Sequence, residues 1–350
     1  MHVKDELIRA IVAEIRLQKD YLHGEQINTI YFGGGTPSIL SMQEIDSLLH
    51  TVFHNFSIDE NAEISFECNP DDLSVSKLTG LYKSGINRLS IGIQSFNNAQ
   101  LEFLHRTHDA HGAIESYDRA RSIGFSNISL DLIYGIPAPD HKIWEEDLER
   151  IVSMAPQHIS SYCLTIEPMT VFGNWVSKNK LKPVSDEFAA EQLELSMQIL
   201  SCAGYDQYEI SNFAQPGYYS RHNSAYWLNE KYLGIGPGAH SFDGTSRQFN
   251  VQNNHKYLRG IKERIVPFEK EVLTKENRAN EYLMTGLRTK WGFNLVKLKE
   301  EYGYDIMYAA GKIVRQLKDK GFLLQEGSVI KLSDSGKLLT DQITADLFWV

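Results

Sequence analysis

The chain has 350 residues and a net charge of −10, with 45 acidic against 35 basic side chains. This balance argues against general nucleic-acid binding, because no surplus of Lys and Arg is present to neutralise phosphates. The length and a hydrophobic fraction of 42% predict a globular protein with one large domain and a smaller one. No stretch is long and apolar enough to cross a membrane, and no signal peptide is expected.

Three cysteines lie far apart in the sequence. They fit a reducing, cytoplasmic location, and they provide neither a disulfide framework nor a local metal motif. Cys68 is the last residue of a predicted strand and is expected near a ligand site. Cys163 and Cys202 are expected to be small core residues.

The first two thirds of the chain alternate predicted strands and helices. An amphipathic helix over 4–22 is followed by a strand at 28–33, and Ser41 with Glu44 forms a capping box before the next helix. Further strands are predicted at 62–68, 88–94, 127–134, 158–164 and 205–210, with helices between them that include 73–83, 110–123 and 186–202. This alternation predicts a parallel sheet covered by helices, either open or closed into a complete or partial barrel.

The last eighty residues have a different pattern. Helices are predicted at 277–289, 295–302 and 306–321, and two strands joined by a Glu326-Gly327 turn follow. Helices followed by a hairpin indicate a winged-helix-like module. The acidic balance favours contact with protein, or packing within the chain, over contact with DNA.

Polar residues and glycines gather where the predicted strands end. The stretch YFGGGTPS at 31–38 places three glycines at a strand end, where a ligand can approach the backbone, and Pro37 pushes Thr36 towards an extended conformation. Parallel sheets bind ligands at the carboxyl ends of their strands, which favours a ligand site over a purely structural role. The other polar residues at this edge are Glu67, Gln94, Arg106 and Asp131. For Asp131 a structural ion pair with Arg88, Arg119 or Arg121 is the alternative.

A second candidate site is the stretch HNSAYW at 222–227. A neutral imidazole ligates haem iron well, and nearby aromatic rings can cover the macrocycle. From the residues alone, a surface or hydrogen-bonded role for His222 remains the alternative. A glycine-rich stretch at 233–242 follows, and its His240 is a candidate for a second ligand.

Four motifs occur in order on the predicted strands: YFGGGTPS at 31–38, ECNP at 67–70, GIQSF at 92–96 and DLIYGIP at 131–137. With them, the chain resembles the radical S-adenosylmethionine (SAM) proteins of the oxygen-independent coproporphyrinogen III oxidase group, and within that group the HemW-like haem chaperones. The resemblance covers nearly the whole chain. It implies a partial (β/α)6 TIM-like radical SAM barrel, missing its first strand, over residues 1–215. A connecting region at 216–270 and a C-terminal winged-helix-like domain at 271–350 would follow.

The resemblance also implies roles for the candidate residues. Gly33, Gly34 and Thr36 would bind the methionyl end of SAM, and Glu67 would hold the ribose hydroxyls. Gln94, Arg106 and Asp131 would complete the pocket, with Arg106 facing the SAM carboxylate. The stretch at 222–227 matches a His-Asn-x-x-Tyr-Trp motif associated with haem binding, so that His222 would ligate the iron and Tyr226 and Trp227 would line the haem.

One feature of the family is not found in this sequence. The family's [4Fe–4S] cluster is normally held by a Cys-x-x-x-Cys-x-x-Cys motif before the first helix, and the three cysteines present cannot replace it by local spacing. Either the sequence is truncated at its N-terminus, which we favour, or the protein lacks the cluster. We predict that the chain as written does not cleave SAM reductively, and no catalytic residue is assigned. The strand at 28–33 would be an exposed sheet edge, lowering stability or promoting self-association.

The predicted function is that of a cytoplasmic haem-binding and haem-trafficking chaperone built on a SAM-binding fold. Its partners would be haem and haem-accepting proteins. Homodimer formation and peripheral membrane association stay open, and nucleic acid is not expected. The alternative is an oxygen-independent coproporphyrinogen III oxidase (dehydrogenase) of porphyrin biosynthesis, and a non-catalytic binding scaffold is a third class. The motif at 222–227 favours the chaperone.

Overall fold

The computed structural model describes residues 2–350, which form two compact units. Unit 1 comprises the residues up to 30 together with 40–63 and 221–350, and unit 2 comprises 31–39 and 64–220. The boundary falls within β1 (Ile27–Phe32) and β2 (Ile58–Cys68), so each of these strands continues from one unit into the other.

A seven-stranded sheet has the order β1-β2-β3-β4-β5-β7-β6. β2, β3 (Arg88–Gln94), β4 (Ile128–Tyr134) and β5 (His158–Cys163) pair in parallel, whereas β7 (Asn212–Ala214) is antiparallel to both β5 and β6 (Asp206–Glu209). The predicted α/β partial barrel is therefore confirmed, with β1 at the sheet edge as expected. The three-residue strand β7 was not predicted, because it is too short for a periodic pattern.

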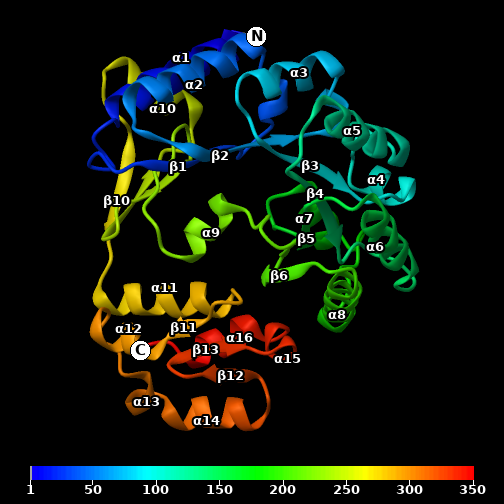
Figure 1. Ribbon diagram of the computed structural model, residues 1–350, viewed down its shortest axis with the longest axis vertical. Coiled ribbons are helices and arrows are strands. Elements are labelled where there is room, and N and C mark those ends of the chain that lie inside the picture. The colour runs from blue at the N-terminus through cyan, green and yellow to red at the C-terminus, as the bar shows by residue number, and fades with distance from the viewer. Residues whose placement is uncertain (1) are drawn as a thin grey trace. The chain divides into compact units, whose positions relative to one another are not determined.

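The helices of unit 2 are α3 (Val75–Lys83), α4 (Asn98–Phe103), α5 (Ala110–Ile123), α6 (Lys142–Met154), α7 (Val171–Ser177) and α8 (Asp186–Cys202). α5 contacts β3 and α8 contacts β4, while α3 packs on α5 and α6 packs on α8. Figure 1 shows α5 and α6 on the same side of β3 and β4. Their buried faces include Tyr117 and Ala120 on α5, and Leu148 and Ile151 on α6. These apolar positions recur at helical spacing, which is why the sequence pattern located the helices.

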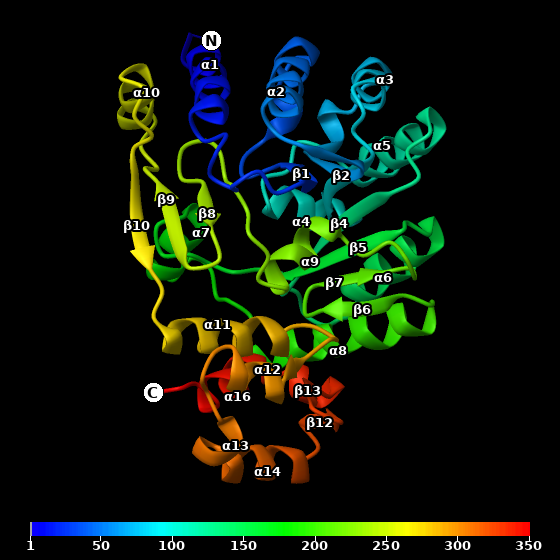
Figure 2. The ribbon, with the colours of Figure 1, turned by 60° about the vertical axis from the view of Figure 1, so that its left-hand side comes forward.

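Unit 1 begins with α1 (His2–Leu17), which packs on α2 (Met42–Asn55) and α10 (Asn254–Lys262). The predicted capping box of Ser41 and Glu44 starts α2. β8 (His240–Phe242), β9 (Ser246–Asn250) and β10 (Phe268–Val272) form an antiparallel sheet, visible in Figure 2, in a region that we had expected only to connect domains. The carboxylate of Glu14, which is fully buried, accepts hydrogen bonds from the Gly236 amide and from Asn250 and Tyr257.

The C-terminal elements have their own core, which includes Leu283, Phe293, Val314 and Ile330. The predicted hairpin is formed by β12 and β13, which pair antiparallel, and β11 adds a third strand that was not predicted, in the order β11-β13-β12. The expected helix over 306–321 is interrupted at Ala310, so that prediction was wrong in detail. The domain boundaries at 215 and 270 stay predictions. The elements are α11 (Lys275–Leu287), β11 (Phe293–Asn294), α12 (Leu295–Glu300), α13 (Ile306–Ala309), α14 (Gly311–Asp319), β12 (Leu323–Glu326), β13 (Val329–Leu332), α15 (Asp334–Lys337) and α16 (Thr340–Asp346).

Two expectations about single residues were wrong. Cys163 and Cys202 are both exposed, whereas Cys68 is buried. Cys163 is the last residue of β5 and Cys202 the last of α8, so each lies where its element leaves the packed interior. Among residues 2–350, no helix combines the length and the hydropathy that a membrane crossing requires.

Candidate functional site

The glycine loop at 33–36 follows β1 and is exposed. A Cβ atom on Gly33 would lie 2.3 Å from Cε1 of Tyr31 and 2.6 Å from Oε1 of Glu67, so any other residue there would force these two side chains to move. Gly34 has a φ of +76°, a conformation that side chains rarely adopt, whereas a Cβ on Gly35 would meet nothing within 4 Å. Tyr31 and Glu67 therefore pack closely against Gly33, whereas the space next to Gly34 and Gly35 contains no other atoms within 4 Å of an added Cβ.

Glu67, the penultimate residue of β2, is fixed beneath this loop. Its Oε1 accepts a hydrogen bond of 2.5 Å from the hydroxyl of Tyr31, and the amide of Gly34 also donates to the carboxylate. Burial raises the pKa of Glu67, and the negative charge of Asp131 acts in the same direction. A carboxylate offers about four acceptor positions, so Glu67 retains capacity to accept from a ligand hydroxyl.

Asn69 joins the glycine loop to Arg106. The Asn69 amide donates to Oγ of Ser38, in the 3-10 turn η1 (Pro37–Ile39) that follows the loop, over 3.3 Å. The Asn69 Oδ1 accepts from Nη2 of Arg106 at 2.8 Å, and Nη2 also donates to the carbonyl of Gly92 at 3.1 Å. These partners of the guanidinium are uncharged. Asp71 is a nearby negative charge, while burial lowers the pKa of Arg106. A half-buried guanidinium whose hydrogen bonds go to neutral groups is suited to binding an anionic ligand group.

Gln94 ends β3 with a φ of +74°, beside a bulge where the register with β4 shifts. A Cβ on Gly92 would lie 2.7 Å from Nε2 of Gln94, so the glutamine amide folds back over the Gly92 backbone. A non-glycine residue in this conformation stores about 1–3 kcal/mol of strain and persists only where its surroundings fix it.

Asp131 is bound by serine hydroxyls. Oγ of Ser90 donates to it at 2.8 Å and Oγ of Ser129 at 2.9 Å. Burial raises the pKa of Asp131, while these hydrogen bonds and the charge of Arg88 lower it. Of the arginines considered as ion-pair partners, Arg119 bonds Leu73 and Glu115, and Arg121 bonds Phe125 and Gln157.

A chain of buried hydrogen bonds continues from Asp131 through unit 2. Oγ of Ser129 lies 2.8 Å from Nδ1 of His158, and Nε2 of His158 lies 2.8 Å from the hydroxyl of Tyr208. The amide of Ser220 donates to that hydroxyl over 3.3 Å. Burial holds the pKa of His158 well below its usual value, so the imidazole is neutral and each ring nitrogen has one role. We name this path the serine–histidine chain.

His222 lies on the short helix α9 (Arg221–Trp227) in unit 1. The buried carboxylate of Glu63 accepts hydrogen bonds from the backbone amides of Arg221 and His222, both at 3.0 Å. Nδ1 of His222 lies 3.1 Å from Oγ1 of Thr29. When Nδ1 carries the proton and donates to Thr29, Nε2 carries the lone pair that can ligate a metal.

The surroundings of His222 keep its imidazole neutral. Burial lowers the pKa of His222 to about 4, and the charge of Glu63 acts weakly in the opposite direction. The ring of Tyr226 meets the imidazole edge-on, with centroids 5.0 Å apart, and also contacts Tyr232. Trp227 ends α9 and is half-buried, and the exposed His240 packs against Phe249 instead. The structure thus brings His222 and Tyr226 into contact.

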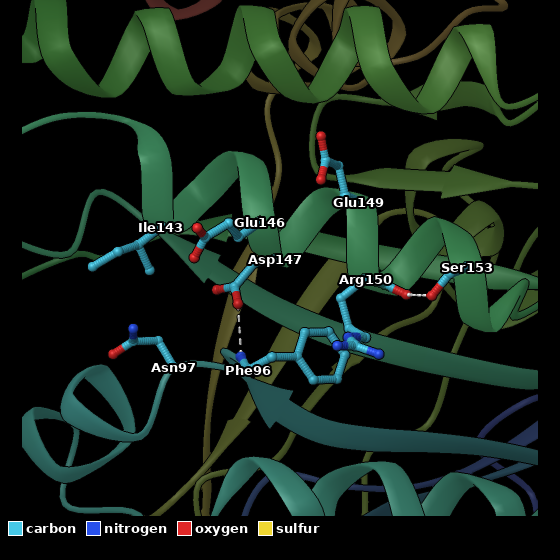
Figure 3. Close-up of a pocket in the computed structure, with 8 residues that line it drawn as sticks. All are labelled: Phe96, Asn97, Ile143, Glu146, Asp147, Glu149, Arg150 and Ser153. Atoms are coloured by element: carbon cyan, nitrogen blue, oxygen red, sulfur yellow. Dashed lines mark hydrogen bonds between the residues drawn. The ribbon is translucent and has the colours of Figure 1, made fainter.

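Metal-binding groups do not gather elsewhere in residues 2–350: no cluster of three or more His, Cys, Asp or Glu side chains is placed to hold an ion. Burial raises the pKa of the Cys68 thiol, which disfavours the thiolate needed for iron. A cavity of about 380 Å³ lies beside α6 (Figure 3), and none of the predicted site residues is among the residues that line it. Its lining residues are Phe96, Asn97, Ile143, Glu146, Asp147, Glu149, Arg150 and Ser153.

Sequence reasoning missed several residues that hold the predicted ones. Thr29 lies at hydrogen-bond distance from the His222 ring and Glu63 accepts from the His222 amide, yet the two residues lie 193 and 159 positions away from His222 in the sequence. Tyr31 and Asn69 stand within the motifs, but their spacing gave no hint of their partners. His158 and Tyr208 carried no recognisable signal at all.

Comparison with known proteins gives the family. The Radical SAM superfamily matches residues 5–151, and the HemN C-terminal domain matches residues 273–339. The haem chaperone HemW of Bacillus subtilis is 36% identical over 341 residues, covering 97% of this chain and 90% of that protein. The HemW of Lactococcus lactis is 35% identical, covering 89% and 82% respectively.

Among solved structures, the coproporphyrinogen III oxidase (HemN) of Escherichia coli, a radical SAM enzyme, superposes with a TM-score of 0.84. It is 22% identical and the match covers 98% of this chain and 83% of that one, which supports a shared fold. The extent of the sequence similarity to the HemW proteins assigns the protein: the chain belongs to the HemW haem chaperone family of the radical SAM superfamily.

Proposed function

We propose that the protein binds haem through His222 and delivers it to haem-accepting proteins. The observation that carries this proposal is the setting of the imidazole: a pKa of about 4 keeps it neutral, and Nδ1 lies 3.1 Å from Oγ1 of Thr29. With the proton on Nδ1, Nε2 would be the ligating atom. Tyr226 is placed at the ring edge, where an aromatic side chain can contact the macrocycle. The names of the HemW relatives point to the same ligand.

We further propose that unit 2 binds SAM. SAM carries a sulfonium, an ammonium and one carboxylate, and the site offers matching groups. Glu67 and Asp131 are acidic and electrostatically coupled, which favours a ligand with net positive charge. The guanidinium of Arg106 donates to the neutral Asn69 Oδ1 and Gly92 carbonyl, and it would also donate to the SAM carboxylate. Gly33, Gly34 and Thr36 would hold the methionyl end, and Gln94 would close the pocket.

The family's [4Fe–4S] cluster does not fit the described residues, because neither a metal-binding cluster nor a reactive thiol lies in the site. We therefore derive no chemistry through it. The oxidase alternative gains nothing from the likeness to the coproporphyrinogen III oxidase structure, since that likeness concerns the fold.

Haem titration tests the main proposal. The wild-type chain should shift the Soret band on binding one haem, and His222→Ala should lose this shift. His240→Ala, at the exposed second-ligand candidate, is the matched control: retained binding there assigns His222 alone, and a changed spectrum makes His240 the second ligand. An unchanged spectrum in His222→Ala would reject His222 as the haem ligand.

A further inference from the structure

Asp147 on α6 is bound to the segment that follows Gln94. Its side chain is buried, and its Oδ2 accepts from Oγ of Ser95 at 2.6 Å. Its Oδ1 accepts the amide of Phe96 at 2.7 Å, the bond drawn in Figure 3. Both donors therefore come from the two residues directly after Gln94. We call residues 94–97 the β3-exit segment.

The β3-exit segment needs such a support. Gln94 has a φ of +74° at a β-bulge, and its amide is folded tightly over Gly92. Strain of this kind persists only where the surrounding structure holds it. The Ser95 hydroxyl lies 3.1 Å from Oε1 of Gln100 and accepts a hydrogen bond from the backbone amide of Asn97 at 3.0 Å. Asp147 therefore holds the segment through Ser95, a residue that makes several hydrogen bonds.

The carboxylate is reachable by protons. Asp147 lines the cavity of about 380 Å³, which water can enter. The charged groups that share this lining are Glu146, Glu149 and Arg150, all from α6, and the β3-exit segment contributes Phe96 and Asn97 without charge. Burial raises the pKa of Asp147 to about 6, and Glu146 adds to the rise. The carboxylate therefore changes its charge close to neutral pH.

We propose that Asp147 is a positioning residue for Gln94, and that its protonation loosens the β3-exit segment and weakens SAM binding. This inference rests on the proposed SAM site. When protonated, the carboxyl can still donate to Oγ of Ser95 and accept from the Phe96 amide, but as neutral hydrogen bonds. Those are about half as strong as bonds to a carboxylate.

Asp147→Asn reproduces the protonated state at every pH. The side-chain oxygen of the new asparagine can accept from the backbone amide of Phe96, and its NH2 group can donate to Oγ of Ser95. The Ser95 hydroxyl can then donate its own hydrogen to Oε1 of Gln100. The variant should fold, because no buried polar atom loses its partner. Because the folded pKa of Asp147 is raised, this group itself adds stability as pH falls from about 6 towards 4. A loss of affinity in acid is then not caused by unfolding through Asp147.

Calorimetric titration of the full chain with SAM tests the inference. At pH 7.5 we expect Asp147→Asn to bind SAM about fivefold more weakly than wild type, and at pH 5 we expect equal affinities. Glu67 and Asp131 titrate in both proteins, so their effect cancels in the ratio of the wild-type SAM affinity to that of Asp147→Asn. Glu149→Gln, which removes a neighbouring exposed carboxylate, should keep wild-type affinity at both pH values. A ratio that does not change with pH would overturn the proposal.

A second measurement needs no ligand. The protection of the Phe96 amide against hydrogen exchange should be about fivefold lower in Asp147→Asn than in wild type at pH 7.5, and equal at pH 5. If the two proteins differ in this way but wild type fails to bind SAM, the proposed SAM site is rejected while the anchoring role of Asp147 stands. Equal protection in both proteins at pH 7.5 would reject that role even where SAM binds.

Discussion

At the scale of single residues, His222 differs from an ordinary surface histidine in its charge state. An imidazole with its usual pKa near 6.5 gains a proton just below neutral pH, and protonation competes with iron ligation. Burial lowers the pKa of His222 to about 4, so protonation competes with iron ligation only as the pH approaches that value. The free protein therefore presents a neutral ligand across the physiological range.

We accordingly predict that haem affinity is constant between pH 7.5 and about 5.5 and falls as pH approaches 4. A ligand with an unshifted pKa of about 6.5 would instead lose about fivefold in affinity between pH 6.5 and 5.5, and about tenfold per pH unit below that. Spectroscopic titration at several pH values distinguishes the two cases. A loss of about fivefold between pH 6.5 and 5.5 would show that the imidazole is exposed to protons as in a free histidine.

Gly33 gives a second prediction at this scale. Gly33→Ala would force a methyl group to within 2.3 Å of the Tyr31 ring and 2.6 Å of Glu67, so we expect a loss of about 1–3 kcal/mol in unfolding free energy. Gly35→Ala is the matched control, since its added Cβ meets nothing within 4 Å, and should stay within about 0.5 kcal/mol of wild type. Denaturant unfolding measures both, and equal stability of the two variants would contradict the packing of Tyr31 and Glu67 against the loop.

At the scale of elements, strands and helices with a full periodic pattern were predictable. The bounds 88–94, 110–123 and 186–202 match β3, α5 and α8. Short strands such as β7 and β8 were not, because three residues show no period. The break at Ala310 was missed as well, since the apolar spacing continues across it.

The positions of the candidate site residues were predictable in part. Parallel topology brings strand ends to one edge of a sheet, which is why Glu67 and Gln94, at the ends of β2 and β3, could be grouped from sequence, whereas Asp131 lies in the middle of β4. The contacts that hold them could not be predicted, because they join distant positions without a local pattern. Glu63 with His222 is one example, and Asp147 with Phe96 is another.

The serine–histidine chain carries a prediction at this scale. His158 is hydrogen-bonded on one side to Ser129 and on the other to Tyr208, so replacing either His158 or Tyr208 removes the hydrogen bond between these two buried side chains. We expect His158→Leu and Tyr208→Phe to be non-additive, with a coupling of about 1 kcal/mol or more in a double-mutant cycle of unfolding free energies. Additive effects would mean that the two side chains do not act together.

At the scale of the whole molecule, the two proposed sites belong to different units of one chain. Gly33, Glu67, Gln94, Arg106 and Asp131 lie in unit 2, and His222 with Thr29 and Glu63 lies in unit 1. The C-terminal elements form a separate core. The family relation spans nearly the full chain, so both sites fall within the matched region.

The radical chemistry of the superfamily yields a whole-molecule prediction. Within the described residues no metal-binding cluster exists, so the iron-reconstituted chain as written should form no 5′-deoxyadenosine from SAM under reducing conditions. Chromatography of the reaction mixture measures the product. Formation above the level of a protein-free control would show that the chain assembles a cluster from its three separate cysteines.

The central claim is that His222 ligates haem iron, and pulsed electron paramagnetic resonance tests it most directly. The ferric haem complex is prepared with nitrogen-15 in the histidines only. The account predicts a nitrogen-15 hyperfine coupling from a ligating imidazole in the wild type, present in His240→Ala and absent in His222→Ala. A coupling that persists in His222→Ala, or none in the wild type, would contradict the account.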